Sequence, residues 1–271
     1  MNRILIVRAC AVGDFVLNLP ALQALHHAQN DVRFTLLGYP PTLELACDFV
    51  PVEAIHSIER EPWSRLFYEP IPGLSFESAV VWMRDPVVSD NLRSSGVPNV
   101  FRANPFPEFG HAATHLLRTI ELPEPSLPDL WKQEAPDIII HASSGSPVKN
   151  WPYFTELITR LGESCVSLWE GPVEASVRVH GCVASDAKHR TLVNQSLIQV
   201  SQHLRKCRGY VGNDSGITHL AAYLGVPTVA LFGPTNPRTW GPIGRQTRII
   251  WKTTLEEISV DEVLETLKWP N

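Results

Sequence analysis

The fold of this chain is decided by the stretch YVGNDSGITHLAAYLGVPTVALF, residues 210–232. An apolar run ends at Val211, and a turn of small and polar residues follows it. Apolar residues then recur at the i, i+3, i+4, i+7 spacing of a helix face, which predicts a helix over residues 217–224. The Gly-Val-Pro sequence at 225–227 supplies a stop signal for that helix. The stretch therefore predicts a strand, a tight loop and a helix.

Similar apolar runs alternate with helix-length segments along the whole chain. The runs are continuous, which is typical of strands that are buried on both faces of a parallel sheet. We expect strands at Ile4 to Val7, Phe34 to Leu37, Ala79 to Trp82, Ile138 to Ile140, Val166 to Leu168, Tyr210 to Val211 and Val229 to Phe232. A final amphipathic helix is expected over residues 260–267. The alternation predicts an α/β protein with parallel sheets covered by helices.

Prolines indicate a boundary between two parts of the chain. The chain has 23 of them, more than the usual roughly 5%, and they concentrate at residues 122–128 and at Pro136. A helix cannot run through such a stretch. Both parts open with a strand that leads into a Gly-containing loop. We therefore expect two similar α/β domains that face each other, over residues 1–125 and 126–271.

Composition narrows the class of protein. No apolar run reaches the roughly 18 residues that a membrane-spanning helix needs, and the N-terminus has no signal-peptide cleavage site, so we expect a soluble protein. The formal net charge of −5 argues against a nucleic-acid partner, so any anion site must be local. The cysteines lack metal-ligand spacing, and we expect reduced core thiols at Cys10, Cys47, Cys165, Cys182 and Cys207.

Three loops at predicted strand ends could carry chemistry. In the first, the start of helix 217–224 offers unpaired N–H groups and a helix dipole, worth about 0.3 to 2 kcal/mol to an anion. A phosphate would bind there. The alternative is that Asp214 or Ser215 only caps the helix.

The second loop, HASSGSPVKN at residues 141–150, joins hydroxyls, backbone amides and Lys149. We expect Lys149 just ahead of a helix started by Trp151-Pro152. Such groups suit a diphosphate, and the alternative is a flexible connector with a solvated lysine.

The third loop leads from the first strand into a helix with Asp14 in its first turn. Pro20 costs that helix a hydrogen bond, so we expect a kink or a short first turn. An acid is favourable at a helix start for dipole reasons alone. Ligands nevertheless bind at the carboxyl ends of strands in an open α/β sheet.

Together the three segments resemble the heptosyltransferases, family nine of the glycosyltransferases. The matching text is ILIVRACAVGDFVLNLPALQAL, HASSGSPVKNWPYFTEL and VGNDSGITHLAAYLGVPTVALFGPTNPRTWGPIG. The resemblance implies a GT-B fold, which is two Rossmann-like, doubly wound domains facing across a cleft. The first would meet the acceptor and the second would bind the nucleotide-sugar donor. It also implies transfer of a sugar, heptose in the family, from a nucleotide-diphosphate sugar such as ADP-heptose to a glycan or lipid-linked acceptor.

The resemblance further implies roles for single residues. Asp14 corresponds to the catalytic base, and Lys149 to the residue that steadies the leaving diphosphate. Glu174 would hold the ribose. The remaining donor-binding residues would be Ser143, Ser144, Asp214, Ser215, Gly216 and His219. No acidic metal cluster accompanies these loops, so we expect an inverting, metal-independent displacement without a cofactor. Such an enzyme of the bacterial cell envelope would be cytoplasmic, with at most peripheral contact at the inner face of the plasma membrane.

Other residues are open to two interpretations. Arg84, Arg93 and Arg102 could meet an acidic acceptor, but a solvated helix face is the favoured reading of each. His111 is expected to cap or pack. Among the tryptophans only Trp240 lies where the matched motif approaches the donor. Two other functions remain: a nucleotide-sugar epimerase of GT-B fold, or a catalytically inactive family member that binds nucleotide sugars.

Overall fold

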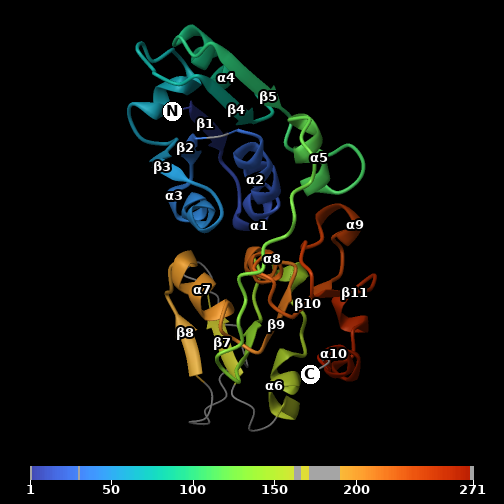
Figure 1. Cartoon of the computed structure of the whole chain (residues 1–271). Helices are drawn as coiled ribbons and strands as arrows, with labels where there is room; N and C mark the ends of the chain where they lie inside the picture. The colour runs from blue at the N-terminus through green and yellow to red at the C-terminus, as the bar shows by residue number, and fades with distance from the viewer. Residues whose placement is uncertain (1, 30, 162–165, 171–189, 269–271) are drawn as a thin grey trace. The chain divides into compact units, whose positions relative to one another are not determined.

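A computed structural model describes residues 2–29, 31–161, 166–170 and 190–268 (Figure 1). The chain divides into two compact units, Met1–Pro125 and Ser126–Asn271, called unit 1 and unit 2 below. Among the described helices, none combines the length and apolar character that crossing a membrane would require.

Unit 1 is built on a parallel sheet in the order β3-β2-β1-β4-β5. Its strands are β1 (Asn2–Arg8), β2 (Val32–Gly38), β3 (Val52–Ser57), β4 (Ser78–Trp82) and β5 (Asn99–Ala103). Its helical segments are α1 (Val12–Val16), α2 (Leu19–Ala28), α3 (Pro40–Leu43), η1 (Glu44–Asp48), η2 (Trp63–Phe67), α4 (Val87–Ser94) and α5 (Ala112–Thr119).

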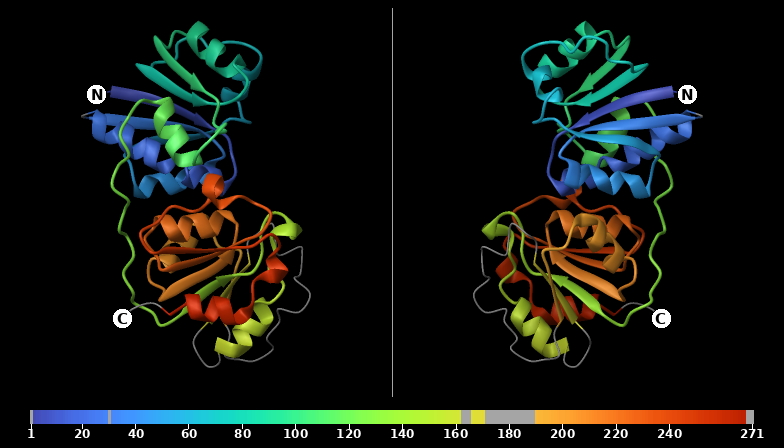
Figure 2. Two further views of the ribbon diagram at one scale, coloured as in Figure 1. Left: turned by 90° about the vertical axis from the view of Figure 1, so that its right-hand side faces the viewer. Right: turned by 90° about the vertical axis from the view of Figure 1, so that its left-hand side faces the viewer.

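Helices cover both faces of the unit 1 sheet (Figure 2). On one face, Leu5 and Val81 pack with Leu66 of η2 and Leu92 of α4 in a buried apolar cluster. On the other face lie α2 and α5, which contact each other. Residues of β1 alternate between these two layers, so the strand is apolar on both sides, as its continuous apolar run predicts.

Unit 2 is built on a parallel sheet in the order β11-β10-β9-β6-β7-β8. Its strands are β6 (Ile138–His141), β7 (Val166–Glu170), β8 (Arg190–Val193), β9 (Gly209–Asn213), β10 (Thr228–Phe232) and β11 (Thr247–Trp251). Its helical segments are η3 (Pro147–Lys149), α6 (Phe154–Leu161), α7 (Leu197–Leu204), α8 (Gly216–Tyr223), α9 (Pro237–Trp240), η4 (Leu255–Glu257) and α10 (Val260–Thr266).

The unit 2 sheet is also covered on both faces, and Figure 2 shows it between two helix layers. Phe154 of α6 and Val263 of α10 pack with Ile140, Val211 and other strand residues in one buried cluster. On the opposite face α7 and α8 contact each other, and α8 lies against β9 and β10. Parallel strands with helices on both sides confirm the predicted α/β class.

The seven strands predicted from apolar runs are all present, and four further strands, β3, β5, β8 and β11, were not predicted. All four are edge strands, β3 and β5 in the sheet of unit 1 and β8 and β11 in the sheet of unit 2. Their described side chains are mostly half-buried or exposed, as in β5 and β11. An edge strand needs no continuous apolar run, because solvent reaches part of its surface, so its sequence gives a weak signal.

Candidate functional site

The loops that follow β6 and β9 lie side by side in unit 2. The two strands pair in parallel, with His141 opposite Gly212 at their carboxyl ends. The strand order reverses here, because β7 and β8 extend the sheet beyond β6 while β10 and β11 extend it beyond β9. Such a switch point is where open α/β sheets bind ligands. The first two candidate loops of the sequence therefore meet at one edge of one sheet.

Ser215 is the N-cap of α8. Its Oγ accepts a hydrogen bond from the backbone N of Thr218 at 3.4 Å and lies 3.1 Å from Nδ1 of His141. Of the two residues offered as caps, Ser215 takes that role and Asp214 does not. The cap leaves the other N–H groups of the first turn, beginning at Gly216, without helical partners. The helix start can therefore still receive an anion.

Asp214 joins the two loops through an ion pair. Its Oδ2 lies 2.6 Å from Nζ of Lys149, and its side chain is 9% exposed. Burial raises the pKa of this carboxyl group, but hydrogen bonds from His219, Lys149 and Thr235 outweigh burial and lower the pKa to about 2. Asp214 is therefore a carboxylate at any physiological pH, and it holds the ammonium group of Lys149 beside the start of α8.

His219 lies on the first turns of α8, next to Asp214. Its Nε2 is 3.8 Å from Oδ1 of Asp214, and its side chain is only 6% exposed. Its Nδ1 is buried, with no hydrogen-bond partner in the described part of the chain. Nε2 of the imidazole thus stabilises the carboxylate of Asp214.

Lys149 ends the short 3-10 turn η3 and does not precede a helix directly. The helix predicted to start at Trp151-Pro152 begins at Phe154 instead, so that prediction was wrong. The reason is tertiary: the indole of Trp151 is buried and donates from Nε1 to the carbonyl O of Ile258 at 2.9 Å. Residues 150–153 therefore lie outside the helix.

Ser143 and Ser144 are both buried in the loop after β6. Oγ of Ser144 lies 2.7 Å from the carbonyl O of Ser146 and 2.9 Å from Oδ1 of Asn150. That hydroxyl therefore shapes the loop. A phosphate contact from Ser144 would have to compete with these hydrogen bonds.

Asp14 lies in the first turn of α1, directly after β1 in unit 1. The predicted break is confirmed, because α1 ends at Val16 and α2 begins at Leu19 with Pro20 in its first turn. Burial raises the pKa of the neighbouring Cys10 thiol to about 12, with the charge of Asp14 adding to it and that of Arg8 opposing it. Asp14 therefore stands at the carboxyl end of β1, beside a thiol that stays protonated.

Several other predicted residues have structural partners. His111 is the N-cap of α5, where its side chain accepts from the N of Ala113. Arg93 pairs with Asp90 at 2.7 Å, and Arg102 donates to the carbonyl O of Arg84 at 2.9 Å. The cap confirms the structural interpretation of His111, and Arg93 lies on helix α4 as expected. Arg102 belongs to strand β5 and Arg84 to the segment after β4, so the predicted helix face was wrong for these two.

Three further predictions have different outcomes. Glu174 lies outside the described residues, as do Cys165 and Cys182. Cys10, Cys47 and Cys207 are free thiols, but only Cys207 is buried and Cys47 is exposed, so the expected core position was wrong for Cys47. Trp240 is half-buried at the end of α9.

Two further residues of the site, Asn213 and Thr235, were not predicted from the sequence. Asn213 is fully buried at the end of β9, and Thr235 follows β10 and contributes a hydrogen bond to Asp214. Their position in the sequence could have indicated them as site residues. Each is a polar residue at or just beyond the carboxyl end of a predicted strand, where open α/β sheets bind ligands.

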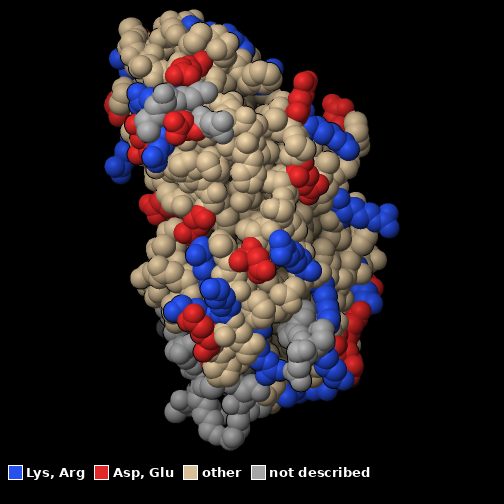
Figure 3. All heavy atoms as spheres, in the orientation of Figure 1, with Lys and Arg blue, Asp and Glu red and all other residues tan. Residues whose placement is uncertain are grey.

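Charges of both signs are interspersed on the face that Figure 3 presents. Within residues 2–29, 31–161, 166–170 and 190–268, no three His, Cys, Asp or Glu side chains form a group that could hold a metal ion. An anion at the loops after β6 and β9 would meet Lys149 and the N–H groups at the start of α8, with the carboxylate of Asp214 beside them.

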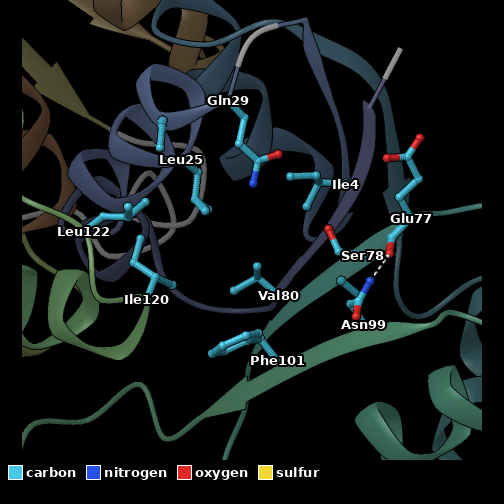
Figure 4. A pocket seen from close by; sticks show the side chains of 12 residues that line it. Ile4, Leu25, Gln29, Glu77, Ser78, Val80, Asn99, Phe101, Ile120 and Leu122 are labelled. Carbon is cyan, nitrogen blue, oxygen red and sulfur yellow. Dashed lines mark hydrogen bonds between the residues drawn. The ribbon is translucent and has the colours of Figure 1, made fainter.

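Unit 1 also contains an apolar cavity of about 500 Å³ (Figure 4). Figure 4 shows Leu25, Val80, Phe101 and Ile120 around it, while the carboxylate of Glu77 points away. Ser78 and Asn99 begin their strands, so the cavity lies at the amino ends of β4 and β5. It is thus at the opposite end of the sheet from Asp14.

The sequence profile of glycosyltransferase family 9 (heptosyltransferase) matches residues 110–269. Lipopolysaccharide heptosyltransferase 1 of Pseudomonas aeruginosa is 36% identical over 115 residues, which cover 41% of this chain and 32% of that protein. The match thus spans about a third of the curated relative.

Two solved structures of Escherichia coli proteins are similar to this chain. Heptosyltransferase WaaC with ADP has a TM-score of 0.80 at 18% identity, over 98% of this chain and 99% of that one. ADP-heptose lps heptosyltransferase II has a TM-score of 0.79 at 20% identity, over 98% and 97%. Their fold is GT-B, and the predicted fold is confirmed.

Proposed function

Given that this chain belongs to glycosyltransferase family 9, the heptosyltransferases, we propose that it transfers a sugar from a nucleotide-diphosphate sugar to an acceptor hydroxyl. The observation that carries this proposal is the 2.6 Å contact between Lys149 Nζ and Asp214 Oδ2. It brings a cation from the loop after β6 to the start of α8, at the switch point of a parallel sheet. Cations and helix starts together favour a diphosphate.

The donor of the proposed reaction is ADP-heptose. This choice is supported by the names of the relatives, one described with ADP and one as an ADP-heptose enzyme. In the proposal, Lys149 and the backbone N–H groups from Gly216 onward bind the diphosphate, with Ser143 and Ser144 beside them. Asp214 and His219 would face the donor, and Glu174 would hold the ribose.

Asp14 acts as the general base of the proposed reaction. Its carboxylate takes the proton of the acceptor hydroxyl while the acceptor oxygen attacks the anomeric carbon. The bond from that carbon to the diphosphate oxygen breaks, and the configuration inverts. The products are the glycoside, the nucleoside diphosphate and a proton on Asp14. Charge that develops on the leaving diphosphate is stabilised by Lys149 and the start of α8. The step requires no metal ion.

The acceptor is proposed to be a glycan or a lipid-linked sugar. Lipopolysaccharide heptosyltransferase 1, a relative of this chain, acts by its name in lipopolysaccharide assembly. The enzyme would then work in the cytoplasm, at the inner face of the plasma membrane. Unit 1 would meet the acceptor and unit 2 the donor.

The first test is thermal stabilisation by ADP, GDP, UDP and their sugars. A nucleotide at 100 times its dissociation constant adds about 2.7 kcal/mol to the free energy of unfolding. We expect the largest shift with ADP or ADP-heptose, and a smaller one in Lys149→Ala. Lys132→Ala is a matched control, because it removes a lysine of unit 2 outside the β6 and β9 loops.

The absence of a shift with every nucleotide diphosphate would overturn the proposal. Measurements of turnover distinguish the proposed transferase from an epimerase and from an inactive family member. Formation of a glycoside in the presence of an acceptor supports the transferase, whereas interconversion of sugar epimers without an acceptor would indicate an epimerase. Binding without any turnover would indicate an inactive family member.

A further inference from the structure

A buried carboxamide fastens both ends of the loop that carries Lys149. The side chain of Asn213 is fully buried at the end of β9. Its Nδ2 donates to the carbonyl O of Ala142 at 2.9 Å, and its Oδ1 accepts from the backbone N of Trp151 at 2.9 Å. Ala142 opens this loop and Trp151 closes it, so one side chain spans its two ends.

The segment between these two ends has little regular structure of its own. It contains the short turn η3, in which the N of Lys149 donates to the carbonyl O of Ser146 at 2.9 Å. Ser143 and Ser144 belong to the same segment. Hydrogen bonds inside the segment, such as those of Ser144 Oγ to Ser146 and Asn150, set its local shape. Its position on the sheet depends on the contacts that hold its two ends.

Asn213 is also tied to the start of α8. Its carbonyl O accepts a hydrogen bond from Oγ1 of Thr218, which is itself fully buried. The Oγ1 of Thr218 also lies 3.0 Å from the hydroxyl of Tyr210 and 3.2 Å from Oγ of Ser215. One residue thus connects the loop of Lys149, through its side chain, to the cap of α8, through its backbone.

We propose that Asn213 is a positioning residue that sets the place of Lys149 relative to the start of α8. The inference rests on the proposed function, because Lys149 and the start of α8 need a fixed relative position only if both bind one diphosphate. Asn213 does not touch the donor. It acts by holding the loop, so that the ammonium group and the helix N–H groups are arranged before the ligand arrives.

The hydrogen bonds at position 213 require a carboxamide side chain. It must donate at Ala142 and accept at Trp151 within a buried site, and a carboxamide carries these two functions on separate atoms. An aspartate would lose the donor and put a charge against the carbonyl group of Ala142. An aliphatic residue would leave a buried C=O and a buried N–H without partners, which is costly.

The test is a double-mutant cycle on ADP binding with Asn213→Ala and Lys149→Ala in the full chain. Lys149→Ala alone should weaken ADP binding by about 10- to 100-fold, the size expected for a hydrogen bond to a charged group. Asn213→Ala should also weaken binding. In the Asn213→Ala variant, adding Lys149→Ala should weaken ADP binding by less than about threefold, because the lysine is no longer held in place.

Thr228→Val is the matched control. Thr228 is fully buried in the same sheet, its Oγ1 donates to the carbonyl O of Val226 at 2.8 Å, and it lies at the amino end of β10. Its replacement should lower stability but leave ADP affinity unchanged, with an additive effect in the Lys149→Ala background. Asn213→Ser repeats the cycle with a milder change if the alanine variant does not fold.

Hydrogen exchange of the ligand-free protein gives an independent readout. The amide of Trp151 donates to Asn213, so exchange in residues 142–151 should accelerate in both Asn213 variants and remain unchanged in Thr228→Val. Additive effects of Asn213→Ala and Lys149→Ala on ADP binding would overturn the inference, as would unchanged exchange. A wild-type protein that binds no nucleotide diphosphate would instead overturn the proposed function, whatever the exchange shows.

Discussion

Gly212 has no room for a side chain. A Cβ atom at this position would lie 2.3 Å from the hydroxyl O of Tyr210, and Tyr210 is fully buried and hydrogen-bonded to Thr218. The tyrosine cannot move without breaking that contact. The glycine is therefore required by packing.

Replacing Gly212 with alanine should destabilise the protein. The expected loss is about 1 to 3 kcal/mol, the usual cost of overpacking a buried site. Gly145→Ala is the control, since a Cβ there meets no atom within 4 Å. Chemical denaturation of both variants measures the difference. Equal stability of the two would contradict the packing argument.

Asp14→Asn tests the proposed base. The variant should keep ADP binding and lose transfer by about 100-fold or more, the usual contribution of general-base catalysis. Asp31→Asn removes an exposed carboxylate of unit 1, and at its positive φ of 58° asparagine is well tolerated. It should transfer at the wild-type rate. Undiminished transfer by Asp14→Asn would remove Asp14 from the mechanism.

At the scale of elements, α8 depends on its cap. Ser215 caps this helix, and seven of its eight residues, Ile217 to Tyr223, are buried. The cap also contacts His141 of β6. A change at Ser215 therefore affects both the helix and the adjoining loop.

Ser215→Ala should lower stability by about 1 kcal/mol, the typical cost of losing an N-cap. It should also weaken ADP binding, because the first turn of α8 would be less ordered. Ser259 caps α10 in the same unit by accepting from the N of Glu262 at 3.1 Å. Ser259→Ala should show a similar loss of stability in calorimetry, with ADP binding intact. If both variants bound ADP equally well, the start of α8 would not be the anion site.

At the scale of the whole molecule, the Asp214 carboxylate makes stability depend on pH. Its pKa is lowered from 3.8 to about 2 in the folded protein. A lowered pKa stabilises the fold above the unfolded value, and this contribution is lost as the pH falls from about 4 through 2. The shift corresponds to about 2 kcal/mol at neutral pH.

The wild-type protein should therefore be more stable than Asp214→Asn at pH 7, and the difference should shrink below pH 4. Urea denaturation at several pH values measures it. Asp129→Asn removes a carboxylate that is 60% exposed and paired with Arg245 at 3.4 Å, and its effect should be small at every pH. A difference between wild type and Asp214→Asn that stays constant down to pH 2 would contradict the proposed coupling.

The sequence alone determined the local units of this protein. Apolar runs such as residues 4–7 and 229–232 predicted strands, because a strand buried on both faces needs apolar residues throughout. Helix spacing and the Gly-Val-Pro stop predicted the extent of α8. Position at strand ends, together with the family resemblance, singled out Asp14, Lys149 and Asp214. These signals are local, and a single sequence carries them.

Only the tertiary structure decided how those units combine. Strand order places β6 beside β9, and it thereby brings Lys149 to Asp214 across 65 positions of sequence. The late start of α6 follows from the burial of Trp151, and the role of Asn213 follows from two distant backbone partners. Hydrogen bonds between segments depend on register and packing, so no local pattern of residues specifies them.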